Sequence, residues 1–175
     1  MDDPFPSQTD IFPVQGPWRA PAEWRDQLGS RRALDTWLGL TGSLTRALRE
    51  ACPAGVDLRI HRRSQAPVPA SGASLLGIGA SEPVWLREVW LLCGEAAVVF
   101  ARSWIPDGVL PDPGEYPLGD RLFEPDSGVD RVSLEAAPVT GPDGSTLWAR
   151  RSLHASAEGR LMVGEVFLPA MDNLL

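Results

Sequence analysis

Two apolar segments of this chain carry charged residues at positions where charge is costly. Residues 84–93 read VWLREVWLLC and include Arg87, and residues 161–169 read LMVGEVFLP, in which Glu165 is the only ionisable group. Burying a guanidinium or a carboxylate without a partner is so unfavourable that these groups usually meet an opposite charge or shift their protonation. The partner can be a side chain or a ligand, so the two segments predict either a structural ion pair or a binding site.

The residue types and their alternation predict that both segments are strands, and the second is apolar enough to be covered on both faces. A two-residue period places Arg87 and Val89 on one face, and Val163 and Glu165 on one face of the last strand. In the structural interpretation, Glu165 pairs with Arg87 or Arg102. In the functional interpretation, both charges point into a pocket, where the arginine binds a carboxylate and the glutamate meets a hydroxyl or ether oxygen.

Other candidate groups give weaker signals. Arg151 could add a second positive charge to such a pocket, or it could be an arginine on an edge strand. His61 and His154 have no neighbours at metal-ligand spacing, so both are expected on strand surfaces. Cys52 and Cys93 are too few for a disulfide framework or a zinc site, and Cys93 is expected in the core. We therefore expect no metal site.

The composition favours one globular domain that binds neither nucleic acid nor a membrane. The chain has 175 residues, 43% of them hydrophobic, and a net charge of −7. An acidic protein repels anions, so an anionic ligand needs locally placed arginines. No segment has the roughly 20 apolar residues that a membrane span requires, and the acidic, proline-containing start is unlike a secretory signal. We expect a cytoplasmic monomer.

The pattern along the chain predicts an α+β domain over residues 21–175, preceded by an irregular arm over residues 1–20. Two short helices are expected within residues 22–52, with a turn near residues 39–42 and Ser43 as the N-cap of the second. A further helix is expected over residues 116–123, opened by Pro117, and a long loop over residues 64–83. Six strands are predicted over residues 56–63, 84–93, 96–105, 131–137, 146–155 and 161–168. Short turns between neighbouring strands favour one antiparallel sheet with helices on one face.

Five short strings together give a resemblance that none gives alone. They are Ser43-Leu44-Thr45, Trp85-Leu86-Arg87-Glu88, Pro117-Leu118-Gly119, Leu147-Trp148-Ala149-Arg150-Arg151-Ser152 and Glu165-Val166-Phe167-Leu168-Pro169. With these strings in this order, roughly residues 30–170 resemble the chorismate lyase family. The resemblance implies a six-stranded antiparallel sheet, an internal ligand cavity sealed by helical flaps, and no cofactor.

The resemblance also implies roles for four residues. Arg87 would bind the ring carboxylate, and Glu165 would reach the opposite end of the ring, so these two are the expected catalytic residues. Leu118 would line the substrate site. Leu44 would line it from a helical flap, where the family often has methionine; this exchange conserves volume.

The activity implied is that of a carbon–oxygen lyase, which converts chorismate into 4-hydroxybenzoate and pyruvate for ubiquinone synthesis. In that role Glu165 could act as an acid or could only position the ring. Two alternatives stay open at this point. One is a lyase that makes another isomer, such as 3-hydroxybenzoate. The other is a non-enzymatic domain of similar fold that binds small acids as effectors of transcription regulators.

Overall fold

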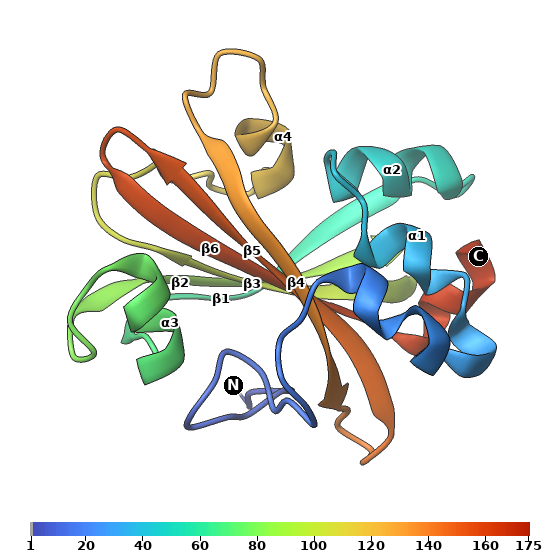
Figure 1. The fold of residues 1–175 in the computed structure, drawn as a ribbon. Helices are drawn as coiled ribbons and strands as arrows, with labels where there is room; N and C mark the ends of the chain where they lie inside the picture. The colour runs from blue at the N-terminus through green and yellow to red at the C-terminus, as the bar shows by residue number, and fades with distance from the viewer. Residues whose placement is uncertain (1) are drawn as a thin grey trace.

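One sheet of six antiparallel strands organises the molecule, and the computed structural model describes residues 2–175. The strands are β1 (Val56–Pro67), β2 (Pro83–Cys93), β3 (Ala96–Ile105), β4 (Asp130–Thr140), β5 (Thr146–Ser156) and β6 (Gly159–Phe167). Their order across the sheet is β1-β2-β3-β6-β5-β4 (Figure 1). The predicted six-stranded antiparallel α+β fold is confirmed.

Two tight hairpins set the positions of the charged strands. Gly94, with a φ of 60°, lies in the turn between β2 and β3, and a second short turn joins β5 to β6. Glycine adopts this left-handed conformation without the steric cost that other residues have. β3 then pairs with β6, so β3 lies between the strand of Arg87 and the strand of Glu165. Ala101 of β3 is the register partner of Glu165. Residues far apart in the chain are thereby brought to the middle of one sheet face.

Most of the helices cover the face of the sheet that carries Arg87 and Glu165. They are α1 (Leu34–Leu38), α2 (Leu44–Ala51) and α4 (Leu118–Leu122), with the 3-10 helices η1 (Pro21–Gln27), η2 (Gly29–Arg31) and η3 (Pro169–Leu174) nearby (Figure 1). The predicted cap is confirmed, since the Ser43 hydroxyl accepts a hydrogen bond from the Arg46 amide at 3.3 Å. Pro117 directly precedes α4, as expected for its start.

The opposite face is covered by α3 (Ala70–Leu76) and by the N-terminal segment, which the prediction of helices on one face did not include (Figure 1). β1 and α3 occupy much of the predicted loop over residues 64–83. Gly72 allows α3 to approach closely, because a Cβ there would lie 2.6 Å from Val68 and 2.9 Å from Met162. Phe5 and Phe12 are fully buried in the same cluster. The N-terminal segment therefore contributes to the core.

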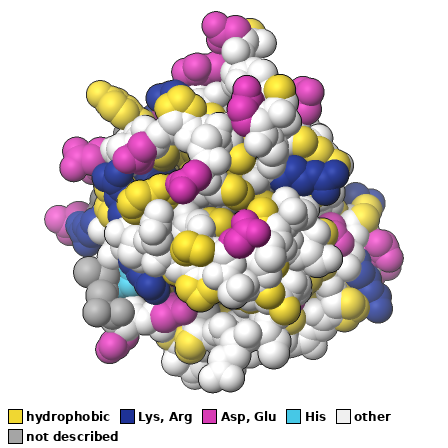
Figure 2. Space-filling model, turned by 90° about the vertical axis from the view of Figure 1, so that its left-hand side faces the viewer, with side chains coloured by type: hydrophobic (Ala, Val, Ile, Leu, Met, Phe, Trp, Pro, Cys, Tyr) yellow, Lys and Arg dark blue, Asp and Glu magenta, His cyan; other side chains and the backbone are white. Residues whose placement is uncertain are grey.

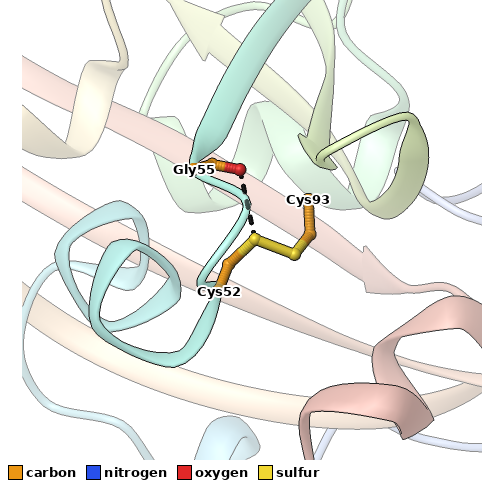
Figure 3. Close-up of a disulfide and its surroundings, with 3 residues drawn as sticks. All are labelled: Cys52, Gly55 and Cys93. Atoms are coloured by element: carbon orange, nitrogen blue, oxygen red, sulfur yellow. Dashed lines mark hydrogen bonds between the residues drawn. A yellow bond between two sulfur atoms is a disulfide. The ribbon is translucent and has the colours of Figure 1, made fainter.

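Cys52 and Cys93 form a disulfide, which the sequence analysis did not expect from only two cysteines. The bond connects the residue after α2 to the last residue of β2, and the Cys52 sulfur lies 3.1 Å from the Gly55 carbonyl oxygen (Figure 3). Sequence spacing could not reveal the pair, because 41 positions separate the two cysteines. The disulfide holds the C-terminal end of α2 against the sheet.

The exterior carries charges of both signs. Figure 2 shows one side of the molecule, on which acidic and hydrophobic side chains are interspersed and basic side chains form small groups. Within residues 2–175, no helix has the length and apolar character needed to cross a membrane.

Candidate active site

A pocket of about 50 Å³ lies between the helical layer and the sheet face that carries Arg87 and Glu165. Its floor is formed by side chains from all six strands, and its roof by α2, α4 and the residues around them. The lining residues on which the chemistry depends are Leu44, Arg87, Leu118, Arg131, Arg150, Ser152, His154 and Glu165. All four residues that the sequence predicted for the site therefore lie around one space. A sealed cavity large enough for a ligand stays a prediction.

Arg87 lies at the β2 end of the pocket and is only 4% exposed. Its Nη2 donates to the carbonyl oxygens of Tyr116 at 2.7 Å and Gly114 at 3.3 Å, while its Nε has no hydrogen-bond partner within residues 2–175. Burial, with a smaller contribution from Arg63, lowers the pKa of Arg87 to about 10, so the side chain is still protonated at neutral pH. A buried cation with an unused donor can bind a carboxylate.

Glu165 pairs with Arg150, not with Arg87 or Arg102 as the structural interpretation expected. The Arg150 Nε donates to Glu165 Oε2 at 2.5 Å, and both side chains are largely buried. The two residues are also register partners on β5 and β6. Arg150 further donates from Nη1 to the carbonyl oxygens of Trp37 and Leu40, each at 3.1 Å. The ion pair thus connects the pocket floor to the turn between α1 and α2.

The alternation of β5 explains why Arg150 and not Arg151 enters the pocket. Arg150 shares its face with Ser152 and His154, whereas Arg151 points to the other side of the sheet. There Arg151 donates to Glu135 at 2.9 Å and 3.0 Å and stacks over the Trp18 ring. β5 lies between β4 and β6, so Arg151 is not on an edge strand either. The second positive charge that Arg151 could have added to the pocket is supplied by its neighbour Arg150.

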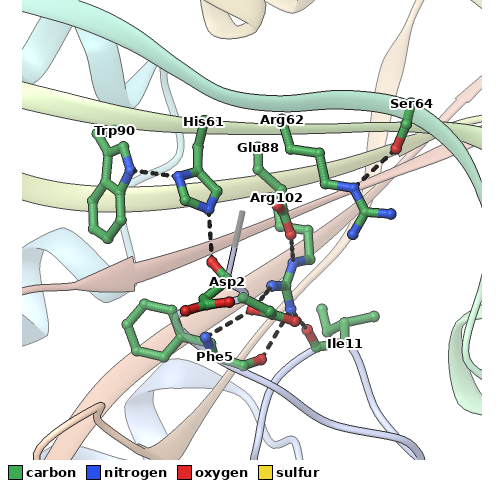
Figure 4. Close-up of polar contacts among 10 residues, drawn as sticks. Asp2, Phe5, Ile11, His61, Arg62, Ser64, Glu88, Trp90 and Arg102 are labelled. Atoms are coloured by element: carbon green, nitrogen blue, oxygen red, sulfur yellow. Dashed lines mark hydrogen bonds and ion pairs between the residues drawn. The ribbon is translucent and has the colours of Figure 1, made fainter.

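Arg102 belongs to a separate network on the opposite face (Figure 4). Its Nε donates to Glu88 at 2.7 Å, its Nη1 to the carbonyl oxygens of Phe5 and Ile11, and its Nη2 to Asp3. All three nitrogens of this guanidinium have partners. Arg102 therefore connects the N-terminal segment to the sheet and is not available to a pocket ligand.

His154 was expected on a strand surface, and that expectation was wrong: the residue is 2% exposed and lines the pocket. Its Nε2 lies 2.9 Å from the Ser152 hydroxyl. Burial lowers the pKa of His154 to about 4, with further contributions from the charges of Arg131 and Arg150. The imidazole is therefore neutral near pH 7. The sequence did contain a signal for this position: His154 is four residues from Arg150, so the two-residue period of a strand places both on the same face of β5.

Arg131, from β4, is a further pocket residue that the sequence analysis did not single out. Its Nη1 donates to the Leu40 carbonyl oxygen at 3.2 Å and its Nη2 to that of Thr41 at 2.8 Å. Burial lowers the pKa of Arg131, and the charge of Arg150 acts in the same direction. With His154 neutral, the charged residues of the lining are three arginines and one glutamate. This excess of positive charge suits an anionic ligand in a protein that is acidic overall.

The roof of the pocket is formed by the first residues of two helices. Leu44 begins α2 and Leu118 begins α4, and both are buried against the pocket. An ion pair of Arg49 with Asp120, with N–O distances of 2.9 Å and 3.0 Å, joins the two helices above it. This pair is exposed to solvent and contributes little to stability.

Comparison with known proteins identifies the family. The family profile described as "Chorismate lyase" matches residues 18–173, which is nearly the whole chain. The chain belongs to the chorismate lyase family. Two chorismate lyase relatives, each named "Probable chorismate pyruvate-lyase", come from Aromatoleum aromaticum and Methylococcus capsulatus. The first is 36% identical and aligns over 81% of this chain and 87% of its own length; the second is 32% identical over 79% and 96%.

Solved structures share the fold of this chorismate lyase family member at lower sequence identity. The effector domain of PhnF from Mycobacterium smegmatis superposes with a TM-score of 0.55 at 14% identity, covering 73% of this chain and 89% of that domain. The ligand-binding domain of a GntR-family transcriptional regulator from Bordetella bronchiseptica gives a TM-score of 0.51 at 20% identity, with 65% and 84% coverage. At such identities the likeness extends to the fold alone.

Proposed function

We propose that this chain removes pyruvate from chorismate to give 4-hydroxybenzoate, and that the product is used in ubiquinone synthesis. The observation that carries the proposal is Arg87, a buried cation with an unused donor in a pocket that also contains Glu165. Relatives that align over about four fifths of the chain are named for the removal of pyruvate from chorismate.

The charges of chorismate complement those of the pocket. Chorismate carries one carboxylate on its ring and a second on its enolpyruvyl ether, so it is a dianion at neutral pH. Three arginines and one glutamate leave two positive charges uncompensated in the lining. In this proposal Arg87 binds the ring carboxylate, and Glu165 contacts the oxygen at the opposite end of the ring. Fixing both ends orients the substrate for cleavage.

The reaction needs the bond between a ring carbon and the ether oxygen to break. The neighbouring ring carbon, which bears the hydroxyl, loses its hydrogen as a proton, and the ring becomes aromatic. The departing enolpyruvate takes up a proton and becomes pyruvate, so atoms and charges balance without an electron carrier. Among residues 2–175, Glu165 is the one carboxyl group in the pocket lining, so it would act on these protons, and its ion pair with Arg150 fixes its position. Positioned acid–base groups typically contribute about 10²–10⁴-fold to a rate.

Substrate binding requires the roof to move. Pockets for small molecules usually measure about 300–1,000 Å³, whereas the space between the sheet and the roof is about 50 Å³. We propose that α2 and α4 separate to admit chorismate and then close over it, with Leu44 and Leu118 against the ring. Closure would exclude water from the reacting bond.

The proposal includes a monomeric cytoplasmic protein without a nucleic-acid partner. In the cytoplasm the Cys52–Cys93 disulfide would be an exception, because disulfides rarely persist in a reducing cytosol. Size-exclusion chromatography tests the monomer, and alkylation of thiols in intact cells reports the redox state of this pair.

The function is tested by incubating the purified chain with chorismate in the presence of a chelator. The proposal predicts stoichiometric 4-hydroxybenzoate and pyruvate, identified by chromatography against both hydroxybenzoate isomers. Formation of 3-hydroxybenzoate would assign the alternative lyase activity. Binding of chorismate or 4-hydroxybenzoate without turnover would assign an effector-binding role, and a strict need for a divalent metal would contradict the absence of a cofactor.

A further inference from the structure

The charged residues of the pocket are spread across the width of the sheet. Arg87 stands on β2, Glu165 on β6 and Arg131 on β4, and β3 and β5 separate them. Neighbouring strands are about 4.8 Å apart, so in the direction across the strands Glu165 lies between the two arginines. Along the strands Arg131 is displaced from Glu165, because its register partner His154 is four positions from Arg150, the partner of Glu165. A ligand that reaches from Arg87 to Glu165 and carries a further anionic group would present that group toward Arg131.

In the part of the chain that the structure describes, the positive charge of Arg131 is not paired with a carboxylate. It makes no ion pair within residues 2–175, and its hydrogen bonds go to the carbonyl oxygens of Leu40 and Thr41. Arg150, the other cation near it, is already paired with Glu165. With Arg87 assigned to the ring carboxylate, Arg131 is the remaining pocket arginine without an ion pair within residues 2–175, so a second anion would be attracted to the β4 end.

His154 provides a second polar group at the same end. It is the register partner of Arg131 across β4 and β5, and its ring is held by the Ser152 hydroxyl at 2.9 Å. A neutral imidazole carries one N–H, which can donate to an anionic oxygen. Arg131 and His154 therefore form a pair of donors that face one corner of the pocket.

This corner also borders a hollow on the surface. A groove of about 390 Å³ shares four lining residues with the buried pocket: Leu122, Phe123, Arg131 and His154. The Arg131 guanidinium lies over the Phe123 ring at 5.8 Å, and the Phe123 ring contacts His154 edge to face. These side chains separate the two spaces, so a small product released here is close to solvent.

We propose that Arg131, assisted by His154, binds the carboxylate of the enolpyruvyl side chain of chorismate, the part that leaves as pyruvate. The assignment rests on the proposed function and adds to it a specificity site for the leaving group. It explains why the pocket has a third arginine although 4-hydroxybenzoate carries only one carboxylate. It also gives pyruvate a route through the groove beside Phe123.

The test compares chorismate with 4-hydroxybenzoate in the variant Arg131→Gln. Losing one charge-assisted contact should raise the KM for chorismate by about 10- to 100-fold. The affinity for 4-hydroxybenzoate, measured by calorimetry, should change by less than about threefold because this molecule has no second carboxylate. Arg131→Lys keeps the charge without the forked geometry and should give an intermediate KM. Arg151→Gln, on the opposite face of the same sheet, is the matched control and should leave both values unchanged.

Three outcomes would overturn the assignment. An unchanged KM for chorismate in a folded Arg131→Gln protein would mean that Arg131 does not contact the substrate. Equal weakening of chorismate and 4-hydroxybenzoate, or an Arg131→Lys protein that is no better than Arg131→Gln, would mean that Arg131 only holds the turn at Leu40 and Thr41. Failure of the proposed function is distinct, because the wild-type chain would then not convert chorismate at all.

Discussion

Arg102 and Arg87 lie on adjacent strands, on opposite faces of the sheet, and each is 4% exposed. Arg102 donates from all three nitrogens to Glu88, Asp3 and backbone carbonyl oxygens. Arg87 donates only from Nη2, and its Nε is without a partner within residues 2–175. Burial of a charge is tolerated when its hydrogen bonds are completed. The hydrogen bonds of Arg102 are all made within the protein, whereas Arg87 keeps a donor that a ligand can use.

The same contrast applies to the two buried glutamates. Glu88 is 1% exposed and neutralises Arg102 beneath the N-terminal segment. Glu165 neutralises Arg150 but also lines the pocket beside two further arginines. Both are ion pairs in a sheet interior, so pairing alone does not separate a structural role from a functional one. What separates them is the cation nearby: the guanidinium of Arg102 has partners on all three nitrogens, whereas Glu165 shares its pocket with Arg87, whose Nε has no partner within residues 2–175.

The largest expected effect comes from Glu165→Gln, compared with Glu88→Gln. Glutamine keeps an oxygen that accepts from Arg150 but cannot exchange a proton, so single-turnover rates per folded molecule should fall by about 10²–10⁴-fold. Glu88→Gln should instead lower the free energy of unfolding by about 1–3 kcal/mol and leave the single-turnover rate within about twofold of wild type. Normal turnover in folded Glu165→Gln protein would mean that the pair of Glu165 with Arg150 has only a structural role.

Reducing the disulfide should lower the free energy of unfolding without changing the reaction at the pocket. The bond closes a loop between residues that are 41 positions apart, and such a cross-link typically stabilises a fold by about 2–4 kcal/mol. Urea unfolding of oxidised and reduced protein measures the difference, and a Cys52→Ser, Cys93→Ser double variant provides the control. Two titratable thiols in the native, unreduced protein would contradict the assignment of the bond.

The smallest expected effect is a pH dependence of stability from His154. Its folded pKa of about 4 lies below the ordinary value of 6.5. Between those pH values the unfolded chain binds more protons than the folded chain, so stability falls as pH drops from about 6.5 to 4, by up to about 3 kcal/mol from this residue. Between pH 7 and pH 4.5 the urea midpoint of wild type should fall relative to that of His154→Gln, which lacks the titrating group. Parallel pH profiles would show that His154 titrates normally.

The central strands could be predicted because their residues repeat with a clear period. Residues 96–105 form a strand with the predicted bounds, and the alternation around Arg87 and Glu165 correctly placed Val89 and Val163 beside the pocket. Short runs of β-branched and aromatic residues between turn signals contain this information locally. The Ser43 cap is equally local, because it depends on one side chain and an amide three residues later.

The partners of those charges depend on strand order, which no local pattern contains. Arg150 and Glu165 become neighbours because β5 and β6 pair in register, and Arg131 reaches the same pocket only because β4 lies beyond β5. His154 and Arg151 were misassigned for the same reason: the exposure of each face of β5 depends on what covers it. The Cys52–Cys93 bond likewise depends on where α2 ends relative to β2.

Calorimetric titration of 4-hydroxybenzoate into wild type and Arg87→Ala tests the central claim, that Arg87 belongs to a ligand site. The ring carboxylate should bind wild type and lose its clamp in the variant, weakening binding by about 2–5 kcal/mol, while Arg87→Lys should recover part of the loss. Arg151→Ala is the matched control and should bind as wild type does. A folded Arg87→Ala protein that binds 4-hydroxybenzoate with wild-type affinity would contradict the account.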